Sequence, residues 1–335
     1  MAHVDTDASA GGDRAQGGRM PDVSFVMAAF NAAPYVKAAI ESALHQTDVE
    51  VEVILVDDCS TDGTADVVAA MSAHEPRITL LRRERQAGAS VARNAAIGAA
   101  RGAWVAILDA DDLIVPERSR HLLDLAAATS ADIVADNFER FVGDDETPVS
   151  TMLDGRPGPY AFFVDAASFF RGNTMFDSTA RLGYIKPMFR TAFLESRKIR
   201  YVDDILIGED YHICMVCLLE GARFVVTSDR SYKYRMRPGS LSWRMRVSHV
   251  RRLLEAHGAL QIDERFGDDA DLKDAARTYA DALRRAELAL GAIEDAKSGR
   301  WPQALLSSAT HPGVWPILLR FASEAVTKRL AGPPR

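Results

Sequence analysis

The sequence has no run of 18 or more consecutive apolar residues, so it predicts no transmembrane helix. It has only three cysteines in 335 residues, too few for a disulfide-stapled scaffold and typical of a protein from a reducing compartment. Basic residues are not in excess either: 40 Lys and Arg face 47 Asp and Glu, and the formal net charge of −7 argues against a nucleic-acid coat. A hydrophobic content of 47% and a charged content of 26% indicate an ordinary globular protein.

Two common phosphate-binding motifs are also missing. The chain has no G-x-x-x-x-G-K-[ST], which excludes a P-loop, and no G-x-G-x-x-G follows its first predicted strand. A nucleotide bound by this chain would therefore need other partners, with aspartates for the base and ribose and a metal ion for the diphosphate.

Short apolar runs alternate with amphipathic segments from position 23 to about 137. The runs are apolar on both faces, as expected of parallel strands that are covered by helices. Predicted strands span 23–29, 51–56, 78–82, 104–110 and 132–137. Predicted helices span 34–46, 62–74, 88–101 and 116–129. The alternation predicts an α/β fold with right-handed crossovers, a doubly wound, mostly parallel sheet with flanking helices.

The alternation stops after about position 141. Turn-forming residues between 143 and 160 predict a surface excursion. Helix-like pieces follow at 188–197 and 209–221, and strand-like pieces at 223–228 and 231–236. The remainder, 243–335, is predicted to be a helical region, with breaks at Gly267, Gly299 and Pro312.

Both ends of the chain carry further expectations. Residues 1–22 lack the apolar segment of a signal peptide, so we expect a disordered N-terminal tail and a cytoplasmic protein. The C-terminal helices have two interpretations. They could pack on the α/β domain that precedes them and shape its binding site, or the apolar and cationic segment 315–330 could contact a membrane or a partner.

Cys214 and Cys217 form a C-x-x-C pair inside an apolar, helix-like run. No second Cys or His pair stands at zinc-binding spacing. We therefore expect both to be small core residues of a helix.

Aspartates follow two of the predicted strands. Asp57 and Asp58 come after the second strand, and Asp109, Asp111 and Asp112 come after the fourth. Ligands of open α/β sheets bind beyond the carboxyl ends of the strands, so these residues should converge on one rim. Asp109 and Asp111, two positions apart at a strand end, should point the same way. A carboxylate cluster needs a cation, and Mg²⁺ or Mn²⁺ bound together with substrate phosphates is the usual solution.

The chain resembles the inverting glycosyltransferases of the GT2 family, which have the GT-A fold. Five stretches carry the likeness, which covers residues 23 to about 242: VSFVMAAFNAAPYVKAAIESALHQ, VEVILVDDCSTDGT, GASVARNAAIGAARGAWVAILDADD, GEDYHICMVCLLEG and YKYRMRPGSLS. Within the family it looks most like bacterial exopolysaccharide enzymes of the succinoglycan type. The resemblance implies a catalytic domain over 23–242, with a nucleotide-sugar half (23–137) and an acceptor half (138–242).

The resemblance also assigns roles to residues that bind the nucleotide. Asp58, with Asp57 beside it, matches the aspartate that hydrogen-bonds the uracil ring, and Arg93 matches a basic residue near the base and ribose. The turn after the first strand would lie along the nucleotide, and the segment 235–240 would fold over the diphosphate. The contacts would come from Ala28, Phe30 and Asn31 in the turn, and from Arg235, Arg237 and Ser240 in the segment.

The D-x-D and E-D motifs of the family supply the chemistry. Asp109-Ala110-Asp111 stands at the D-x-D motif, so Asp109 would contact the ribose and Asp111 the metal, a role that Asp109 and Asp112 could share. Glu209-Asp210 stands at the E-D motif, with Asp210 as the general base. An inverting transfer is a single displacement, so one carboxylate must take the proton of the acceptor hydroxyl.

The function implied is a metal-dependent inverting glycosyltransferase, an enzyme that moves a hexose from a nucleotide sugar in exopolysaccharide or cell-surface polysaccharide synthesis. Its cofactor would be Mn²⁺ or Mg²⁺, and its first-choice donor UDP-glucose. The acceptor would be a saccharide, including a lipid-linked one, and the C-terminal helices would then touch the cytoplasmic face of the inner membrane. No nucleic-acid partner is expected.

Two other functions fit the sequence less well than a glycosyltransferase. A nucleotidyltransferase would need a Gly-rich, basic loop after the first strand, and AAFNAAPYV has neither property. A catalytically silent scaffold of an assembly complex predicts a damaged D-x-D or E-D motif, and both are intact.

Overall fold

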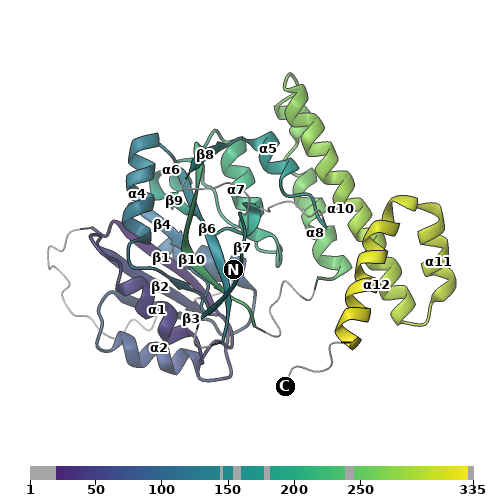
Figure 1. The fold of residues 1–335 in the computed structure, drawn as a ribbon. Helices are drawn as coiled ribbons and strands as arrows, with labels where there is room; N and C mark the ends of the chain where they lie inside the picture. Colours follow the sequence, from purple (N-terminus) through teal and green to yellow (C-terminus); the bar gives the residue numbers. More distant parts are fainter. Residues whose placement is uncertain (1–19, 144–145, 154–159, 177–181, 238–244, 331–335) are drawn as a thin grey trace. The chain divides into compact units, whose positions relative to one another are not determined.

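The structure is a computed structural model that describes residues 20–143, 146–153, 160–176, 182–237 and 245–330 (Figure 1). The expected tail lies almost wholly outside the described residues, as does Ser240. Two compact units divide the chain, one of residues 1–166 and 182–240, the other of residues 167–181 and 241–335. None of the helices in the described part combines the length and the apolar character needed to cross a membrane.

The first unit is built on a ten-stranded sheet in the order β3-β2-β1-β4-β9-β6-β10-β5, with β7 beside β6 and β8 beside β10. The strands β3, β2, β1 and β4 are parallel, and β6 and β10 are parallel to each other. The strands are β1 (Val23–Ala29), β2 (Val51–Asp57), β3 (Ile78–Arg82), β4 (Trp104–Ile107), β5 (Leu113–Ile114), β6 (Ile133–Val142), β7 (Thr147–Thr151), β8 (Ala161–Val164), β9 (Met188–Arg190) and β10 (Phe224–Arg235). The predicted α/β fold is thus confirmed.

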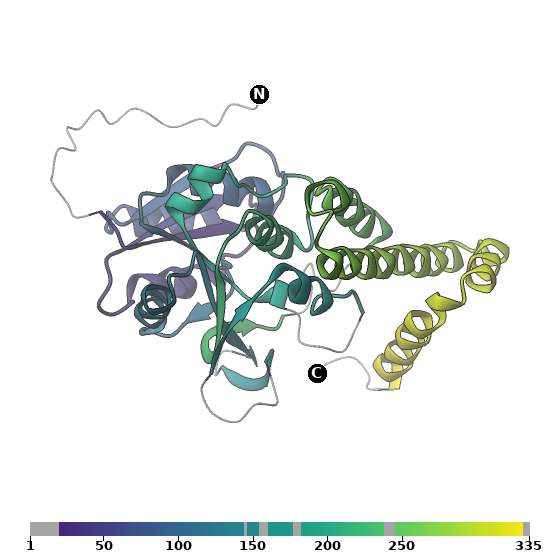
Figure 2. The same ribbon diagram turned by 90° about the horizontal axis from the view of Figure 1, so that it is seen from above.

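Helices of the first unit flank this sheet, as Figures 1 and 2 show. They are α1 (Val36–Leu44), α2 (Thr64–Ser72), α3 (Ala89–Ala99), α4 (Arg118–Thr129), α6 (Thr191–Arg197) and α7 (Glu209–Leu219). Every residue of β2 is buried, and so is all of β1 except Ala28, which is half-buried. These strands are apolar on both faces because helices cover both sides, as the sequence pattern indicated.

Three predictions about the later elements need correction. The pieces 223–228 and 231–236 are one strand, β10, with irregular register between Thr227 and Tyr232. The segment 188–197 begins as strand β9 and becomes helix α6 only at Thr191. The fourth strand ends at Ile107, so Asp109 to Asp112 form a turn beyond it.

The second unit consists of helices in its described part, as predicted for the region after 243. They are α5 (Ala166–Arg171), which begins at the unit boundary, α8 (Val247–Gly258), α9 (Ile262–Arg265), α10 (Ala270–Lys297), α11 (Trp301–Thr310) and α12 (Trp315–Leu330). The 28-residue α10 is its central element, and α8, α11 and α12 all contact it. The predicted breaks at Gly267, Gly299 and Pro312 all fall between α-helices, and Pro312 begins a short 3₁₀ helix (Pro312–Val314).

Candidate active site

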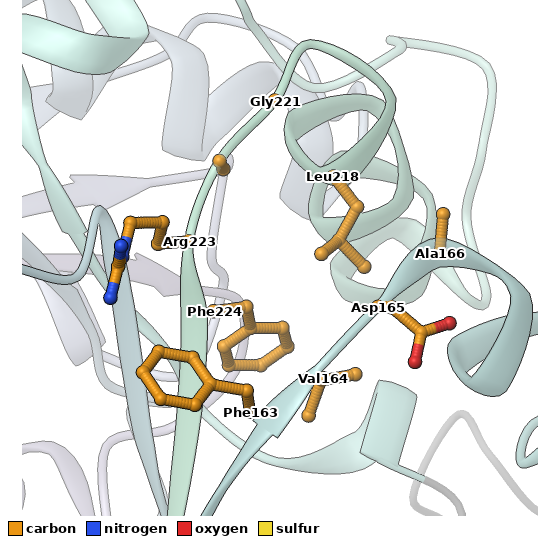
Figure 3. Close-up of a pocket in the computed structure, with 9 residues that line it drawn as sticks. Phe163, Val164, Asp165, Ala166, Leu218, Gly221, Arg223 and Phe224 are labelled. Carbon is orange, nitrogen blue, oxygen red and sulfur yellow. The ribbon is translucent and has the colours of Figure 1, made fainter. Parts of the chain in front are cut away.

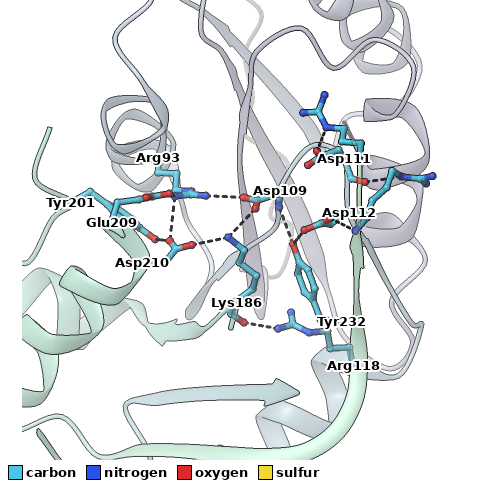
Figure 4. Close-up of polar contacts among 12 residues, drawn as sticks. Arg93, Asp109, Asp111, Asp112, Arg118, Lys186, Tyr201, Glu209, Asp210 and Tyr232 are labelled. Atoms are coloured by element: carbon cyan, nitrogen blue, oxygen red, sulfur yellow. Dashed lines mark hydrogen bonds and ion pairs between the residues drawn. The ribbon is translucent and has the colours of Figure 1, made fainter. Parts of the chain in front are cut away.

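The aspartates after β2 and β4 lie at the carboxyl ends of two parallel strands that flank β1 in the sheet. Figure 4 shows that Asp109 and Asp111 point to different partners, so the expectation that they point the same way is wrong. The reason is the early end of β4, which puts both residues in a turn closed by a bond from the Asp112 N–H to the Asp109 carbonyl (3.2 Å).

Asp109 is held between two cations. Arg93 from α3 donates to one carboxylate oxygen (2.7 Å), and Lys186, just before β9, contacts the other (2.8 Å). Burial alone would raise the pKa of Asp109, but Lys186 and Arg93 outweigh it and lower that pKa. Asp109 is therefore ionised.

The same two cations reach the acidic pair at the start of α7. Lys186 Nζ lies 2.7 Å from Asp210 Oδ2, and Arg93 lies 2.7 Å from Glu209 and 3.2 Å from Asp210. Glu209 and Asp210 occupy the first turn of α7, where the helix dipole favours negative charge. Arg93 and Lys186 thus join the D-x-D turn to the E-D motif in one cluster (Figure 4).

The charges of this cluster do not balance. Burial opposes the charge on Lys186, but Asp109 and Asp210 raise its pKa, so it is a cation like Arg93. Two cations then face three carboxylates, Asp109, Glu209 and Asp210. Burial, followed by the repulsion of Asp210, raises the pKa of Glu209. The cluster can therefore accept one further proton.

Tyr201 completes the surroundings of Asp210. Its hydroxyl donates to Asp210 Oδ1 (2.9 Å), and its ring lies beneath the Arg93 guanidinium, 5.4 Å from ring centroid to Cζ. Burial, followed by the charge of Asp210, raises the pKa of this tyrosine, which keeps it a hydrogen-bond donor.

Asp111 has a different neighbour. Arg237 donates to its Oδ2, and Arg237 also lies over the ring of Tyr35. Burial and the charge of Asp109 raise the pKa of Asp111, although Arg237 opposes this. Arg237 thus belongs to the segment that was predicted to cover the diphosphate, and a guanidinium group suits phosphate oxygens.

Asp112 forms hydrogen bonds within the protein through both carboxylate oxygens. Its carboxylate accepts from the Tyr232 hydroxyl (2.7 Å) and from the Arg235 backbone N–H (2.8 Å), and it is buried. Burial and the charges of Asp111 and Asp109 raise its pKa well above the ordinary range. These contacts fasten β10 to the D-x-D turn.

Arg118, the first residue of α4, supports this cluster from behind. It is fully buried, pairs with Asp136 (2.8 Å), donates to the Lys186 carbonyl (2.7 Å) and lies over the Tyr232 ring. Arg118 therefore fixes two parts of the cluster. It holds the backbone at Lys186, and it packs on the ring of Tyr232, whose hydroxyl donates to Asp112.

The predicted base-binding residues lie at the ends of β1 and β2. Asp58 accepts from the backbone N–H groups of Ala87 and Gly88 and pairs with Arg83 (3.1 Å). The neighbouring Asp57 accepts from Ser60 N–H through Oδ2, and its buried Oδ1 has no hydrogen-bond partner among the described residues. Of these two carboxylates, Asp57 is thus the one with an oxygen, Oδ1, that can accept a further hydrogen bond.

The turn after β1 has the strained backbone that often marks a binding loop. Asn31 has a positive φ of 50°, and its side chain accepts from the Thr61 N–H (2.9 Å), which ties this turn to the loop after β2. Phe30 beside it is exposed, and Ala28 is half-buried at the end of β1.

A metal ion would find only part of its ligand set in the protein. The described residues contain no group of three His, Cys, Asp or Glu side chains placed to hold a metal. Both oxygens of Asp109 and of Asp112 already have partners, whereas the Arg237 side chain pairs with only one oxygen of Asp111, Oδ2. This fits a Mg²⁺ or Mn²⁺ ion that takes one carboxylate and completes its shell with substrate phosphate and water.

Sequence reasoning missed Lys186, Tyr201 and Tyr232, which bind the motif aspartates. Lys186 and Tyr201 lie in the region between the two motifs, where no pattern marked them, while Tyr232 belongs to the recognised YKYRMRPGSLS stretch. The C-x-x-C prediction is confirmed, since Cys214 and Cys217 are free, buried residues of α7.

A pocket elsewhere in this unit is separate from the cluster (Figure 3). It is lined by the end of α7 around Leu218, by Phe224 at the start of β10 and by Phe163 of β8. It therefore lies at the opposite end of α7 from Glu209 and at the amino end of β10. Ligands of α/β sheets bind at the carboxyl ends of the strands, so the pocket is not the expected donor site.

Comparison with known proteins decides the family. The profile "Glycosyl transferase family 2" matches residues 24–193. The succinoglycan biosynthesis protein ExoO of Rhizobium meliloti is 35% identical over 322 residues, which cover 93% of this chain and 87% of ExoO. The chain belongs to glycosyl transferase family 2. ExoU of the same organism is 30% identical over 93% of this chain and 91% of its own length.

Solved structures of other proteins share the fold of this glycosyltransferase. The chain matches S. aureus TarS 1-349 in complex with UDP-GlcNAc with a TM-score of 0.56 and 17% identity, covering 87% of this chain and 92% of that one. It spans 43% of a longer TarS chain. Mannosyltransferase PcManGT from Pyrobaculum calidifontis, in complex with GDP-Man and Mn²⁺, matches with a TM-score of 0.55 and 18% identity over 92% of this chain and 81% of its own. The GT-A fold expected from the resemblance is confirmed.

Proposed function

We propose that this glycosyltransferase is a metal-dependent inverting enzyme that transfers a hexose from a nucleotide sugar, with UDP-glucose as first choice, to a saccharide or lipid-linked acceptor. The pathway would be exopolysaccharide or cell-surface polysaccharide synthesis. Two family-2 relatives that match over nine-tenths of the chain are named succinoglycan biosynthesis proteins, which supports this assignment. TarS with UDP-GlcNAc and PcManGT with GDP-Man and Mn²⁺ support a nucleotide-sugar donor and a divalent ion.

One observation carries the proposal: Lys186 contacts both Asp109 and Asp210, at 2.8 and 2.7 Å. Asp109, which would contact the donor, and Asp210, which would deprotonate the acceptor, thus lie on either side of the Lys186 ammonium group. A single displacement needs this closeness, since the acceptor must attack the anomeric carbon while the nucleoside diphosphate leaves.

Asp210 is the proposed general base. An ionised carboxylate has about four acceptor sites. Tyr201, Arg93 and Lys186 occupy three, which leaves one for an acceptor hydroxyl. Transfer of its proton would bring the formal charge of the cluster of two cations and three carboxylates to zero.

Donor binding would use the residues at the other strand ends. Asp57 Oδ1, which has no hydrogen-bond partner among the described residues, would accept an N–H from the base, and Asp58 beside it accepts from the backbone N–H groups of Ala87 and Gly88. Arg237 would contact the diphosphate. A metal ion held by Asp111 would neutralise charge on that diphosphate when it is bound.

The experiment is calorimetric titration of UDP into the purified chain, first with Mn²⁺ and then with EDTA. Micromolar binding is expected with Mn²⁺, weakened at least about tenfold by EDTA or by Asp111→Ala, since either removes the charge compensation of the diphosphate. Asp124→Ala, at an exposed aspartate of α4, is the matched control and should bind UDP normally.

Other outcomes would change the assignment. If GDP binds and UDP does not, the donor class is wrong while the metal site stands. If UDP binds equally with Mn²⁺ and EDTA, the metal dependence is wrong. Turnover of UDP-glucose, UDP-galactose, UDP-GlcNAc and GDP-mannose, measured as release of the nucleoside diphosphate, then ranks the sugars.

A further inference from the structure

Two helices of the second unit expose large apolar side chains. On α11, Trp301, Leu305 and Leu306 are 61%, 64% and 67% exposed. On α12, Trp315 and Leu319 are 45% and 63% exposed. Large apolar side chains that are exposed on two successive helices, and are not scattered singly over the surface, indicate an interaction site.

These residues are not the ones that hold the helices in place. On α11, the buried side is formed by Ala304 and Ser308, on the opposite face of the helix from Leu306. On α12, Ile317 is buried in a core cluster with Ala289 of α10, whereas Leu319 points about half a turn away. Each helix therefore buries some side chains in the unit and leaves large apolar side chains exposed, and on α12 the exposed Trp315 and Leu319 lie opposite the buried Ile317.

The two helices start alike. Each begins with a Trp-Pro pair, Trp301-Pro302 on α11 and Trp315-Pro316 on α12. Tryptophan is enriched where protein meets the interface of a membrane, because its ring is apolar and its N–H is polar. Figures 1 and 2 show α11 and α12, in yellow, at the C-terminal end of α10.

The charge of this part of the chain is opposite to that of the whole. From position 297 onward the sequence has six Lys or Arg residues and one acidic residue, Glu324, in a chain whose net charge is −7. A segment of net positive charge that also exposes apolar side chains complements an anionic lipid leaflet. A second copy of the chain fits less well, because a symmetric contact would bring two positive segments together.

We propose that α11 and α12 form a lipid-binding surface that rests on an anionic bilayer, with Trp301, Leu305, Leu306, Trp315 and Leu319 at the level of the head groups. The contact is peripheral, since no helix in the described part can cross a membrane. It goes beyond the proposed reaction, which needs neither helix.

The test is co-sedimentation of the full chain with vesicles of phosphatidylcholine, alone or with phosphatidylglycerol added, without donor or acceptor. Binding is expected to the anionic vesicles, with a blue shift of tryptophan emission, and it should weaken at about 0.5 M salt. Leu306→Glu with Leu319→Glu should weaken it about tenfold or more for each leucine. Val149→Glu, at an exposed residue of β7, is the matched control and should bind like the wild type.

Trp301→Gln is a milder second variant, expected to weaken lipid binding and to reduce the emission shift. Circular dichroism checks that each variant keeps its helices. The proposal is overturned if the wild type does not prefer anionic vesicles or if the double variant binds them as well as the wild type. It is also overturned if the wild type self-associates without lipid and the double variant is monomeric, since the surface would then join copies. Failure of the donor titration leaves this result untouched, because no nucleotide is present.

Discussion

At the scale of the residue, the centre of the site is a lysine that no motif marked. Lys186 is almost fully buried, which costs free energy for an ammonium ion unless carboxylates surround it. Here two do, and each belongs to a different motif. The position of Lys186 therefore fixes the separation between the donor side and the acceptor side of the site.

The base assignment is tested by Asp210→Asn. Because the amide keeps the size of the side chain but cannot take a proton, UDP affinity should change by less than about threefold while transfer falls by about 10²–10⁴-fold. Glu209→Gln, at the neighbouring position, should cause a smaller loss. Initial rates of UDP release and calorimetry measure both quantities. Near-normal turnover by Asp210→Asn, or a larger loss in Glu209→Gln, would contradict the assignment.

Lys186→Met removes the ion between the two motifs. Asp109 and Asp210 would then repel each other with only Arg93 to compensate, and we expect kcat to fall about 10²-fold. Lys37→Met, at an exposed lysine of α1, is the control. Steady-state kinetics well below the Tm of each variant separates this effect from unfolding. Unchanged kcat would show that the lysine only fills space.

At the scale of the element, the turn between α3 and β4 depends on a close backbone approach. Gly102 donates its N–H to Ser24 Oγ of β1 (2.7 Å), and a Cβ at this position would lie 2.6 Å from Ser24 N. This approach sets how β4, and with it the D-x-D turn, lies beside β1.

Gly102→Ala should therefore lower the free energy of unfolding by about 1–3 kcal/mol, because backbone must shift to admit the methyl group. Gly98→Ala is the matched control in α3, where a Cβ meets nothing within 4 Å. It should be neutral or raise stability by up to about 1 kcal/mol. Urea unfolding followed by circular dichroism gives both values. Equal effects of the two substitutions would contradict the packing argument.

Elements with a strong apolar pattern were predictable, and short ones were not. The strands 23–29 and 78–82 have the predicted bounds, because both are distinct apolar runs. The two-residue β5 and three-residue β9 are too short to show a period, and polar Ser228 to Arg230 divide the pattern of the single strand β10. The motif carboxylates were found because their spacing is distinctive. Lys186 was not, because its role exists only once β9 lies between β4 and β6.

At the scale of the whole molecule, the thiols report how well the fold excludes solvent. Cys214 and Cys217 are buried in α7, and burial is the main reason that the pKa of each thiol is raised. A raised pKa lowers the thiolate fraction at neutral pH, and thiolate is the reactive form. Cys59 is only partly buried.

With Ellman's reagent at pH 8, one of the three thiols of the native protein should react quickly and the other two only as the chain unfolds. Denaturant should release all three, and Cys59→Ser should abolish the fast phase. A fast reaction of two or three thiols in the native protein would contradict the packing of α7.

The contacts of Arg118 determine which mutations a genetic screen would recover. Its guanidinium lies behind the cluster and reaches Asp136, the Lys186 carbonyl and the Tyr232 ring. A screen for colonies that have lost activity would recover alleles at Arg118 or Asp136 beside those at the motif aspartates. Such alleles would map to a helix start and a central strand, and would be read as catalytic defects although neither side chain belongs to a recognised motif. Suppressors of them are to be sought in β10, the strand that Arg118 and Asp112 both hold.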